Sequence, residues 1–230
     1  MISLLPVTGL PEVAAGTEIA ELVLACAQLQ ERDVLVITQK VVSKAEGRLV
    51  RCDAADPAAR SQLVQAQSRR VLRERDGMAI TETLHGFVCA NAGIDFSNVP
   101  EGMAALLPVD PDRSARHIRD AVRARAGIEI GVIISDTFGR TWRNGLTDVA
   151  IGCAGIAAVV DLRGTCDAGG RELAVTQVCV ADELAGAAEL VKGKASGVPA
   201  VIVRGVERSW FREGSVRAEI VRPYGSDLFR

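Results

Sequence analysis

The sequence feature that most constrains the fold is a short apolar run that changes abruptly into polar residues. Residues 131–134 are Gly-Val-Ile-Ile, and residues 135–137 are Ser-Asp-Thr. A β-branched run without polar interruption is typical of a strand that is buried on both faces. We expect this strand to end at about Ile134, which would place Asp136 in a loop at its carboxyl end. Ligands of open α/β proteins bind at such strand ends.

The polar residues after this strand suit a site for anions held through a metal. Asp136 and Thr137 offer the hard oxygen ligands that Mg²⁺ or Mn²⁺ prefers. Arg140 and Arg143 carry planar guanidinium groups that match phosphates and carboxylates. We therefore take Asp136, Arg140 and Arg143 as candidate catalytic residues. The alternative, that the Asp-Thr pair only forms a turn or caps a helix, stays open.

A second carboxylate follows another pair of expected strands. Residues 79–83 and 86–90 form a candidate hairpin, and residues 91–98, Asn-Ala-Gly-Ile-Asp-Phe-Ser-Asn, form a loop after it. Asp95 in this loop can share a metal with Asp136, because two carboxylates from separate loops are a common set for a metal that bridges to phosphate. The predicted metal ligands are thus Asp95, Asp136 and Thr137. An Asx-turn at Asp95 is the competing interpretation.

The rest of the pattern predicts a mixed α+β fold. Apolar periodicity favours strands at 33–38, 173–180 and 200–204, and helices at 17–29 with Thr17 as the cap, 112–126 and 181–191. The sequence around Lys194 lacks a P-loop, because Ala188 and Ala195 stand where a Gly and a hydroxyl are required. No Gly-x-Gly-x-x-Gly fingerprint follows a strand. A bound nucleotide would therefore need a different fold from either of these.

Composition excludes several classes of protein. The chain has 230 residues, of which 48% are hydrophobic, yet it contains no apolar run long enough to span a membrane. The formal net charge of −2 argues against a nucleic-acid partner. Six cysteines without a Cys-x-x-Cys pair and only two histidines make a zinc site improbable. The N-terminus lacks the features of a signal peptide, so we expect a cytoplasmic protein.

Five motifs occur in order along the chain, at residues 5–12, 40–49, 93–98, 135–145 and 190–194. Together they resemble the coenzyme F420-0:γ-glutamyl ligase family, and among its members they look most like the ligase domain of the actinobacterial bifunctional enzyme. The resemblance implies an α+β fold of two intertwined subdomains and a homodimer. It predicts one ligase domain over residues 1–230, without the nitroreductase-like second domain of the bifunctional enzyme.

The family resemblance also implies a reaction. Members of the family join L-glutamate to F420-0 and then add further γ-linked glutamates, using GTP and a divalent metal, Mg²⁺ or Mn²⁺, with K⁺ as a further candidate cation. A carboxylate is a poor acyl donor, so the γ-phosphate of GTP is first transferred to it, and the amine of glutamate then attacks the acyl phosphate. Such an enzyme mainly positions groups and neutralises charge.

By the same resemblance, the nucleotide would contact two groups of residues, Leu10, Pro11, Glu12, Val13, Gln39, Lys44 and Asn98, and Lys192, Gly193 and Lys194. The chain departs from the family at two of these positions. Gln39 stands where relatives commonly have Ser or Thr. Lys194 stands where some archaeal members place an acidic or amide metal ligand, and a charged lysine cannot coordinate a metal. Lys194 is therefore expected to contact phosphate.

The small residues of the stretch 151–160 permit close approach and are the candidate dimer interface. Two other functions also remain open. One is a metal-dependent phosphatase or nucleotidyl enzyme that uses Asp95 and Asp136, and the other is a non-enzymatic F420-binding module in which both aspartates only form turns.

Overall fold

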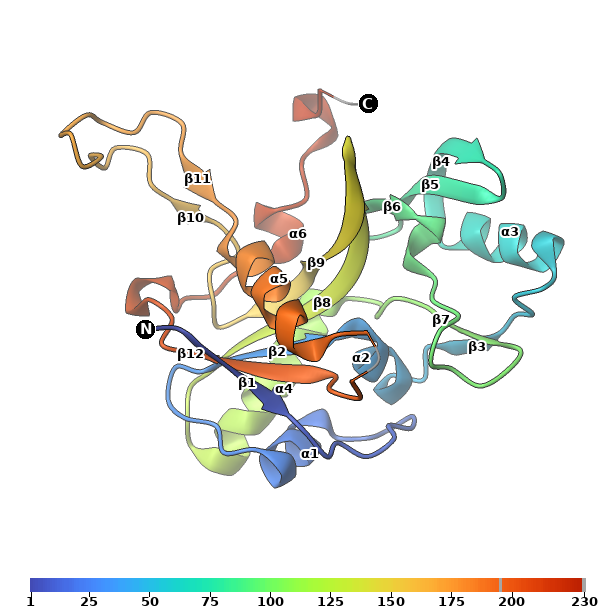
Figure 1. Ribbon diagram of the computed structural model, residues 1–230, viewed down its shortest axis with the longest axis horizontal. Helices are drawn as coiled ribbons and strands as arrows, with labels where there is room; N and C mark the ends of the chain where they lie inside the picture. Colours follow the sequence, from blue (N-terminus) through green and yellow to red (C-terminus); the bar gives the residue numbers. More distant parts are fainter. Residues whose placement is uncertain (195, 229–230) are drawn as a thin grey trace.

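A five-stranded mixed sheet organises the computed structural model, which describes residues 1–194 and 196–228 (Figure 1). Its strands, in spatial order, are β1 (Ser3–Val7), β12 (Ala200–Arg204), β2 (Val34–Thr38), β8 (Gly131–Arg140) and β9 (Arg143–Ala154). Only β2 and β8 are parallel neighbours, and the other pairs are antiparallel. Ala195, which stands where a P-loop would have a hydroxyl, lies outside the described residues.

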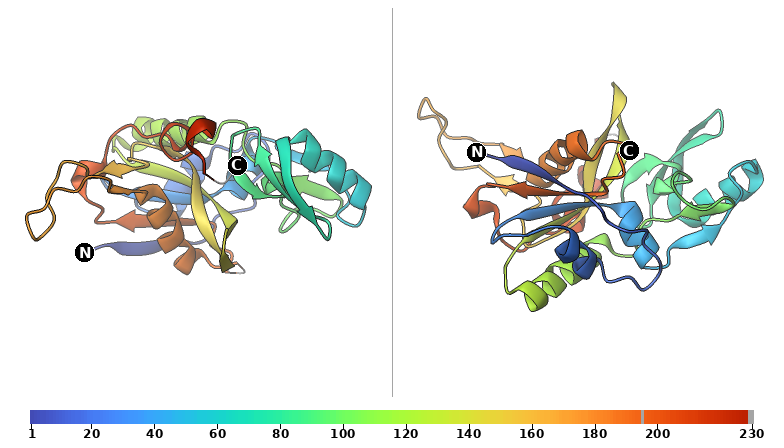
Figure 2. Two further views of the ribbon diagram at one scale, coloured as in Figure 1. Left: turned by 90° about the horizontal axis from the view of Figure 1, so that it is seen from above. Right: turned by 60° about the horizontal axis from the view of Figure 1, so that its bottom comes forward.

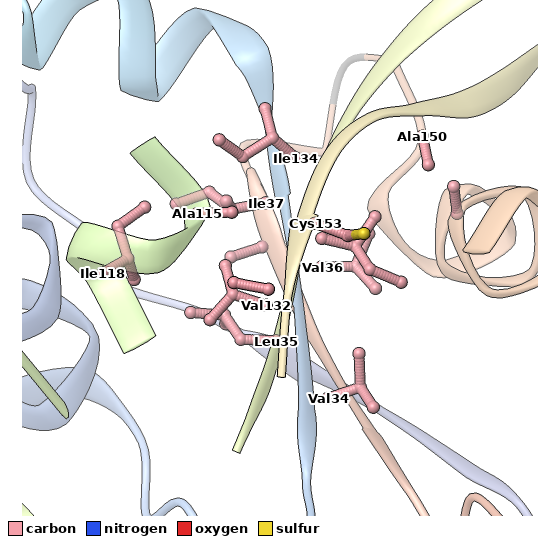
Figure 3. Close-up of a cluster of buried hydrophobic side chains, with 14 of the residues drawn as sticks. Val34, Leu35, Val36, Ile37, Ala115, Ile118, Val132, Ile134, Ala150 and Cys153 are labelled. Atoms are coloured by element: carbon pink, nitrogen blue, oxygen red, sulfur yellow. The ribbon is translucent and has the colours of Figure 1, made fainter. Parts of the chain in front are cut away.

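The core lies on both faces of this sheet. Helices α1 (Ile19–Cys26) and α4 (Pro111–Ala126) lie on one side of it and α5 (Val180–Lys192) on the other (Figure 2). Along β2, Leu35 and Ile37 point toward α4, whereas Val34 and Val36 point toward α5 (Figure 3). Because side chains alternate along a strand and both faces are covered, a continuous apolar run is what this position requires. This confirms the buried strands expected at 33–38 and 200–204.

A smaller lobe lies beside the sheet, at the right of Figure 1. It follows α2 (Gln39–Ala45) and contains β3 (Leu49–Arg51), α3 (Pro57–Ala66), β4 (Ser68–Arg75), β5 (Met78–Thr83), β6 (Val88–Ala90), the 3₁₀ turn η1 (Asn91–Gly93) and β7 (Met103–Ala105). Strands β5 and β6 form the expected hairpin. Phe87 of this hairpin packs edge-on against Phe138 of β8, with ring centroids 6.3 Å apart, and so joins the two lobes.

The remaining elements are short. They are β10 (Val160–Asp161), β11 (Gln177–Val178), η2 (Arg208–Trp210), α6 (Val216–Glu219) and η3 (Tyr224–Ser226). The strand expected at 173–180 is thus reduced to two residues. The helix expected at 17–29 is also shorter, and Thr17 does not cap it, because its hydroxyl accepts a hydrogen bond from the Ala14 N–H instead. Among the described residues, no helix is both long and apolar enough to cross a membrane.

Strand β8 continues well past Ile134, so the prediction that Asp136 lies in a loop was wrong. Asp136 pairs with Val149 and Thr137 with Asp148, in a hairpin that projects from the sheet as a twisted arm (Figure 1). The polar residues can remain in a strand because β9 satisfies their backbone groups, while their side chains need not enter the apolar core.

The stretch 151–160 is not a surface, which overturns its assignment as the dimer interface. Ile151, Cys153 and Ile156 are buried within the single chain. A Cβ atom at Gly152 would lie 2.3 Å from the carbonyl carbon of Pro111, so the small residue serves the approach of α4. Side chains also cover the outer edge of β9 here. Asp112 of α4 accepts a hydrogen bond from the Cys153 N–H, and Asp182 of α5 accepts one from the Ala150 N–H.

Candidate active site

Strand β8 presents two different groups of polar side chains where the lobes meet. Successive side chains of a strand point to opposite faces. Asp136 lies on the side of the small lobe, close enough for Asp95 to raise its pKa. Thr137 lies on the side of α5, where its hydroxyl donates to Asp148 at 2.6 Å. We call the first group (Asp136, Asp95 and Lys40) the carboxylate face and the second (Ser135, Thr137, Asp148, Glu189, Lys192 and Lys194) the lysine face.

Asp95 is held in place by its backbone and its side chain. Asp95 and Ala105 exchange two backbone hydrogen bonds, which fix the loop to β7. One carboxylate oxygen accepts from the Ser97 N–H at 2.7 Å, so the Asx-turn is present, and the other lies 3.0 Å from Nζ of Lys40. Burial opposes ionisation of Asp95, but these hydrogen bonds and the lysine lower its pKa. The turn and a role in metal binding are thus compatible.

Asp136 has a carboxyl group whose pKa is strongly raised. Burial, with the added repulsion of Asp95 and Asp148, raises the pKa of its carboxyl to about 7, although the Thr137 N–H and the charge of Lys40 oppose this. A carboxylate in such surroundings gains from a nearby cation. Asp95 and Asp136 therefore fit a divalent metal.

The carboxylate face does not by itself complete a coordination sphere. Within residues 1–194 and 196–228, no group of three or more His, Cys, Asp or Glu side chains is arranged to hold a metal. Mg²⁺ typically takes one or two protein carboxylates and fills its remaining positions with water and substrate phosphate oxygens. Two aspartates are enough for this kind of site.

The lysine face contains a buried ion pair. Nζ of Lys192 lies 2.5 Å from Asp148, and both side chains are 3% exposed. The Lys192 ammonium also donates to Ser135 at 2.7 Å. Burial disfavours ionised Asp148, but Lys192 and the neighbouring hydroxyls lower its pKa. Lys192, which the sequence predicted as a nucleotide contact, is thus enclosed and occupied by protein partners. This structure gives it a supporting role in place of a direct contact.

Lys194, two residues further on, remains open on one side. Its ammonium donates to the Thr137 hydroxyl and lies 2.8 Å from Glu189 and 3.5 Å from Asp148. The side chain is nevertheless 60% exposed. The hydroxyl of Thr137 donates to Asp148 and accepts from Lys194, so both of these contacts hold it on the lysine face. The predicted metal ligands Asp136 and Thr137 therefore point into different surroundings.

Most of the other predicted nucleotide contacts meet at α2. Lys44 forms an ion pair with Glu12, which brings the segment Leu10, Pro11, Glu12 and Val13 to this helix. Gln39 is the first residue of α2 and is fully buried. Its Oε1 accepts from Ser43, while its Nε2 has no hydrogen-bond partner among the described residues. Asn98 is exposed in a left-handed conformation, with φ of 53°, beside Ser97, which binds Lys40.

The predicted catalytic arginines lie elsewhere. Arg140 and Arg143 pair with each other at the exposed tip of the β8–β9 hairpin, and Arg140 donates to the Asn144 carbonyl at 2.8 Å. Arg140 lies four positions along the strand from Asp136, which corresponds to about 13 Å. In the part of the chain that the structure describes, these arginines do not come together with Asp95 and Asp136.

Sequence reasoning missed Asp148 and Glu189, but one signal pointed to their surroundings. Of the 27 basic residues in the chain, only four are lysines. They are Lys40 and Lys44 on α2, Lys192 at the end of α5 and Lys194 just beyond it. A chain that otherwise uses arginine thus concentrates its compact ammonium groups around the carboxylates, which is a bias visible in the sequence alone.

Over nearly its whole length, the chain is similar in sequence to one protein family and to several named relatives. The family model described as F420-0:Gamma-glutamyl ligase matches residues 9–205. The coenzyme F420:L-glutamate ligase of Methanothermobacter thermautotrophicus is 42% identical over 249 residues, covering 100% of this chain and 99% of the relative. The protein of the same name from Methanopyrus kandleri is 44% identical, covering 95% of this chain and 94% of the relative. That from Archaeoglobus fulgidus is 40% identical, covering 100% of this chain and 96% of the relative.

Proposed function

Since the chain belongs to the F420-0:gamma-glutamyl ligase family, we propose that it joins L-glutamate to F420-0 and then adds further γ-linked glutamates during coenzyme F420 biosynthesis. The relatives named coenzyme F420:L-glutamate ligase match almost end to end, which supports this activity. The raised pKa of Asp136 beside Asp95 is the structural observation that most favours the metal-dependent chemistry.

The proposed reaction has two steps. The terminal carboxylate of F420-0 attacks the γ-phosphorus of GTP, which forms an acyl phosphate and releases GDP. The amine of L-glutamate then attacks the acyl carbon, loses a proton and expels inorganic phosphate, which leaves an amide. Both steps bring several negative charges together, so the protein's task is to hold the reactants in line and to neutralise charge.

Asp95 and Asp136 would hold the divalent metal, Mg²⁺ or Mn²⁺. A bound metal would supply positive charge to the phosphate oxygens. Lys40 lies against Asp95 in this structure and carries a single positive charge at the same place. A metal that took over Asp95 would leave this ammonium free to bind a phosphate oxygen. K⁺ remains a further candidate cation.

The nucleotide would lie along α2. The unpartnered Nε2 of buried Gln39 supports this placement, because a buried amide donor without an acceptor is costly unless a ligand supplies one. Lys44 of the same helix forms an ion pair with Glu12. Asn98 follows Ser97, whose hydroxyl accepts a hydrogen bond from Lys40 of α2.

We also propose that the protein forms a homodimer. With 151–160 buried, the projecting β8–β9 arm is the better candidate surface. It exposes Trp142 by 87% and Leu146 by 67%, and apolar side chains of this size are enriched at protein interfaces. Arg140 and Arg143 lie on the same arm, so a dimer through it would carry them toward the partner.

Mass spectrometry tests the proposed function. F420-0 incubated with the protein, L-glutamate, GTP and Mn²⁺ should gain a ladder of glutamate-sized increments, and omission of GTP or addition of EDTA should abolish the ladder. Asp136→Asn should lower the rate by about a thousandfold, since it removes a charge required in the transition state. Circular dichroism should show that the variant keeps its fold.

The alternatives give different results. GTP turnover that does not depend on glutamate would favour a phosphatase or nucleotidyl enzyme. Tight F420-0 binding without turnover, unchanged by EDTA, would favour a binding module. Either result would contradict the ligase proposal.

A further inference from the structure

The lysine face already holds a cation that belongs to the protein. Nζ of Lys194 lies among three oxygen atoms from separate elements, namely the Thr137 hydroxyl on β8, Asp148 on β9 and Glu189 on α5. Hydroxyl and carboxylate oxygens gathered around one point form a ligand set that suits a hard cation. Here the ammonium of Lys194 occupies that point.

The charges of the lysine face balance only when Lys194 is present. Asp148 and Glu189 contribute two negative charges, and Lys192 and Lys194 contribute two positive charges. Lys192 is fully enclosed, so it can neutralise Asp148 but cannot face a ligand. Without Lys194, the remaining oxygens would form an open site with one uncompensated negative charge.

This arrangement differs from an ordinary surface pair. An exposed lysine–carboxylate pair contributes little, because water screens it and both side chains lose freedom. Lys194 instead contacts the buried Asp148 network on its inner side while more than half of its side chain faces outward. An ammonium is also a compact point charge, unlike the planar guanidinium that this chain uses almost everywhere else.

We propose that the ammonium of Lys194 acts as a tethered monovalent cation, which fills the oxygen site of Thr137, Asp148 and Glu189 and presents its charge to a phosphate of the substrates. The proposal rests on the proposed function in one respect, namely that a phosphate-bearing substrate binds beside β8. It assigns the divalent metal to the carboxylate face alone, because Thr137 points to the opposite face of β8 from Asp136 and contacts Lys194 there.

Removal of the lysine should expose a site that small cations can fill. Lys194→Ala should lower kcat by about a hundredfold, comparable to the loss of one charge-stabilising donor. Methylammonium chloride or potassium chloride should raise the kcat of Lys194→Ala by about tenfold. Choline chloride at equal ionic strength should not, because choline is too large for the vacated site. Lys44→Ala is the matched control, since it also removes a lysine near the nucleotide but leaves no vacant oxygen site and should show no such rescue.

A second measurement does not depend on activity. In EDTA and without substrates, K⁺ or methylammonium should raise the melting temperature of Lys194→Ala by about 2–4 °C relative to choline, while the wild type should not respond. A wild-type kcat for Lys194→Ala, or the absence of the cation effect in either measurement, would overturn the proposal. If the wild type forms no glutamylated product, the proposed function fails, and the melting experiment alone decides whether the cation site exists.

Discussion

The two faces of β8 carry similar carboxylates in opposite electrostatic states. On the lysine face, Asp148 is buried, yet its pKa is lowered because Lys192 lies against it. On the carboxylate face, burial raises the pKa of Asp136 to about 7, and its nearest charged neighbours include a second aspartate. These two aspartates lie on adjacent strands of one hairpin, so the difference comes from their neighbours and not from burial alone.

The difference shows which half of the site the protein completes by itself. The lysine face is neutralised internally and can form as the chain folds. With both carboxyl groups ionised, the carboxylate face keeps a negative charge that a proton or a cationic ligand can relieve, which is costly for stability but useful for binding a metal. Functional sites commonly retain such incomplete interactions.

The largest effect on stability should come from removing the buried ion pair of the lysine face. Lys192→Met leaves Asp148 as a buried charge with its main partner removed, and we expect a loss of about 3–5 kcal/mol in the free energy of unfolding. Urea denaturation at neutral pH measures this loss. The double variant Lys192→Met with Asp148→Asn should recover much of it, because no unpaired charge remains. An unchanged stability of the single variant would show that the pair does not stabilise β8 and β9.

A substitution on the carboxylate face should change the free energy of unfolding by a smaller amount and should stabilise the protein. A folded-state pKa of about 7 against 3.8 when unfolded means that Asp136 contributes stability at low pH, which is lost as the pH rises through the folded pKa. We therefore compare the free energy of unfolding of Asp136→Asn with that of the wild type in EDTA. The difference in favour of the variant should be about 2–3 kcal/mol larger at pH 8 than at pH 5. Urea unfolding at both pH values measures this difference. If the stability difference between variant and wild type were the same at both pH values, the surroundings of Asp136 would not disfavour its ionised form. Added Mn²⁺ should reduce the extra stability of the variant at pH 8.

The smallest effect should come from a residue that belongs to neither face. Arg143→Ala removes an exposed side chain at the hairpin tip, so its free energy of unfolding should stay within about 0.5 kcal/mol of the wild type. We expect the rate of glutamate addition, measured by the mass-spectrometric assay, to fall by less than about tenfold. A loss as large as that of Asp136→Asn would instead place the arginine in contact with substrate, as the sequence suggested.

The elements predicted correctly from the sequence are mostly those whose signal is local, since apolar runs predicted β2, β12 and α5. Carboxylates in two separate segments also predicted that Asp95 and Asp136 would lie close to each other. Other predictions were wrong where a partner distant in sequence decides the structure. Ser135-Asp136-Thr137 stays in a strand because β9 pairs with it, and the small residues 151–160 serve the packing of α4. The burial of Lys192 depends on Asp148, which lies 44 residues away.

The outer edge of β9 has one more consequence, for the behaviour of the protein at high concentration. An exposed strand edge offers unpaired N–H groups to which another chain can add a strand, and this is a common start of aggregation. Here carboxylates from α4 and α5 accept the N–H groups of Cys153 and Ala150. A strand from another molecule would first have to displace two negatively charged acceptors. Edge-to-edge polymerisation is thereby disfavoured at the base of β9.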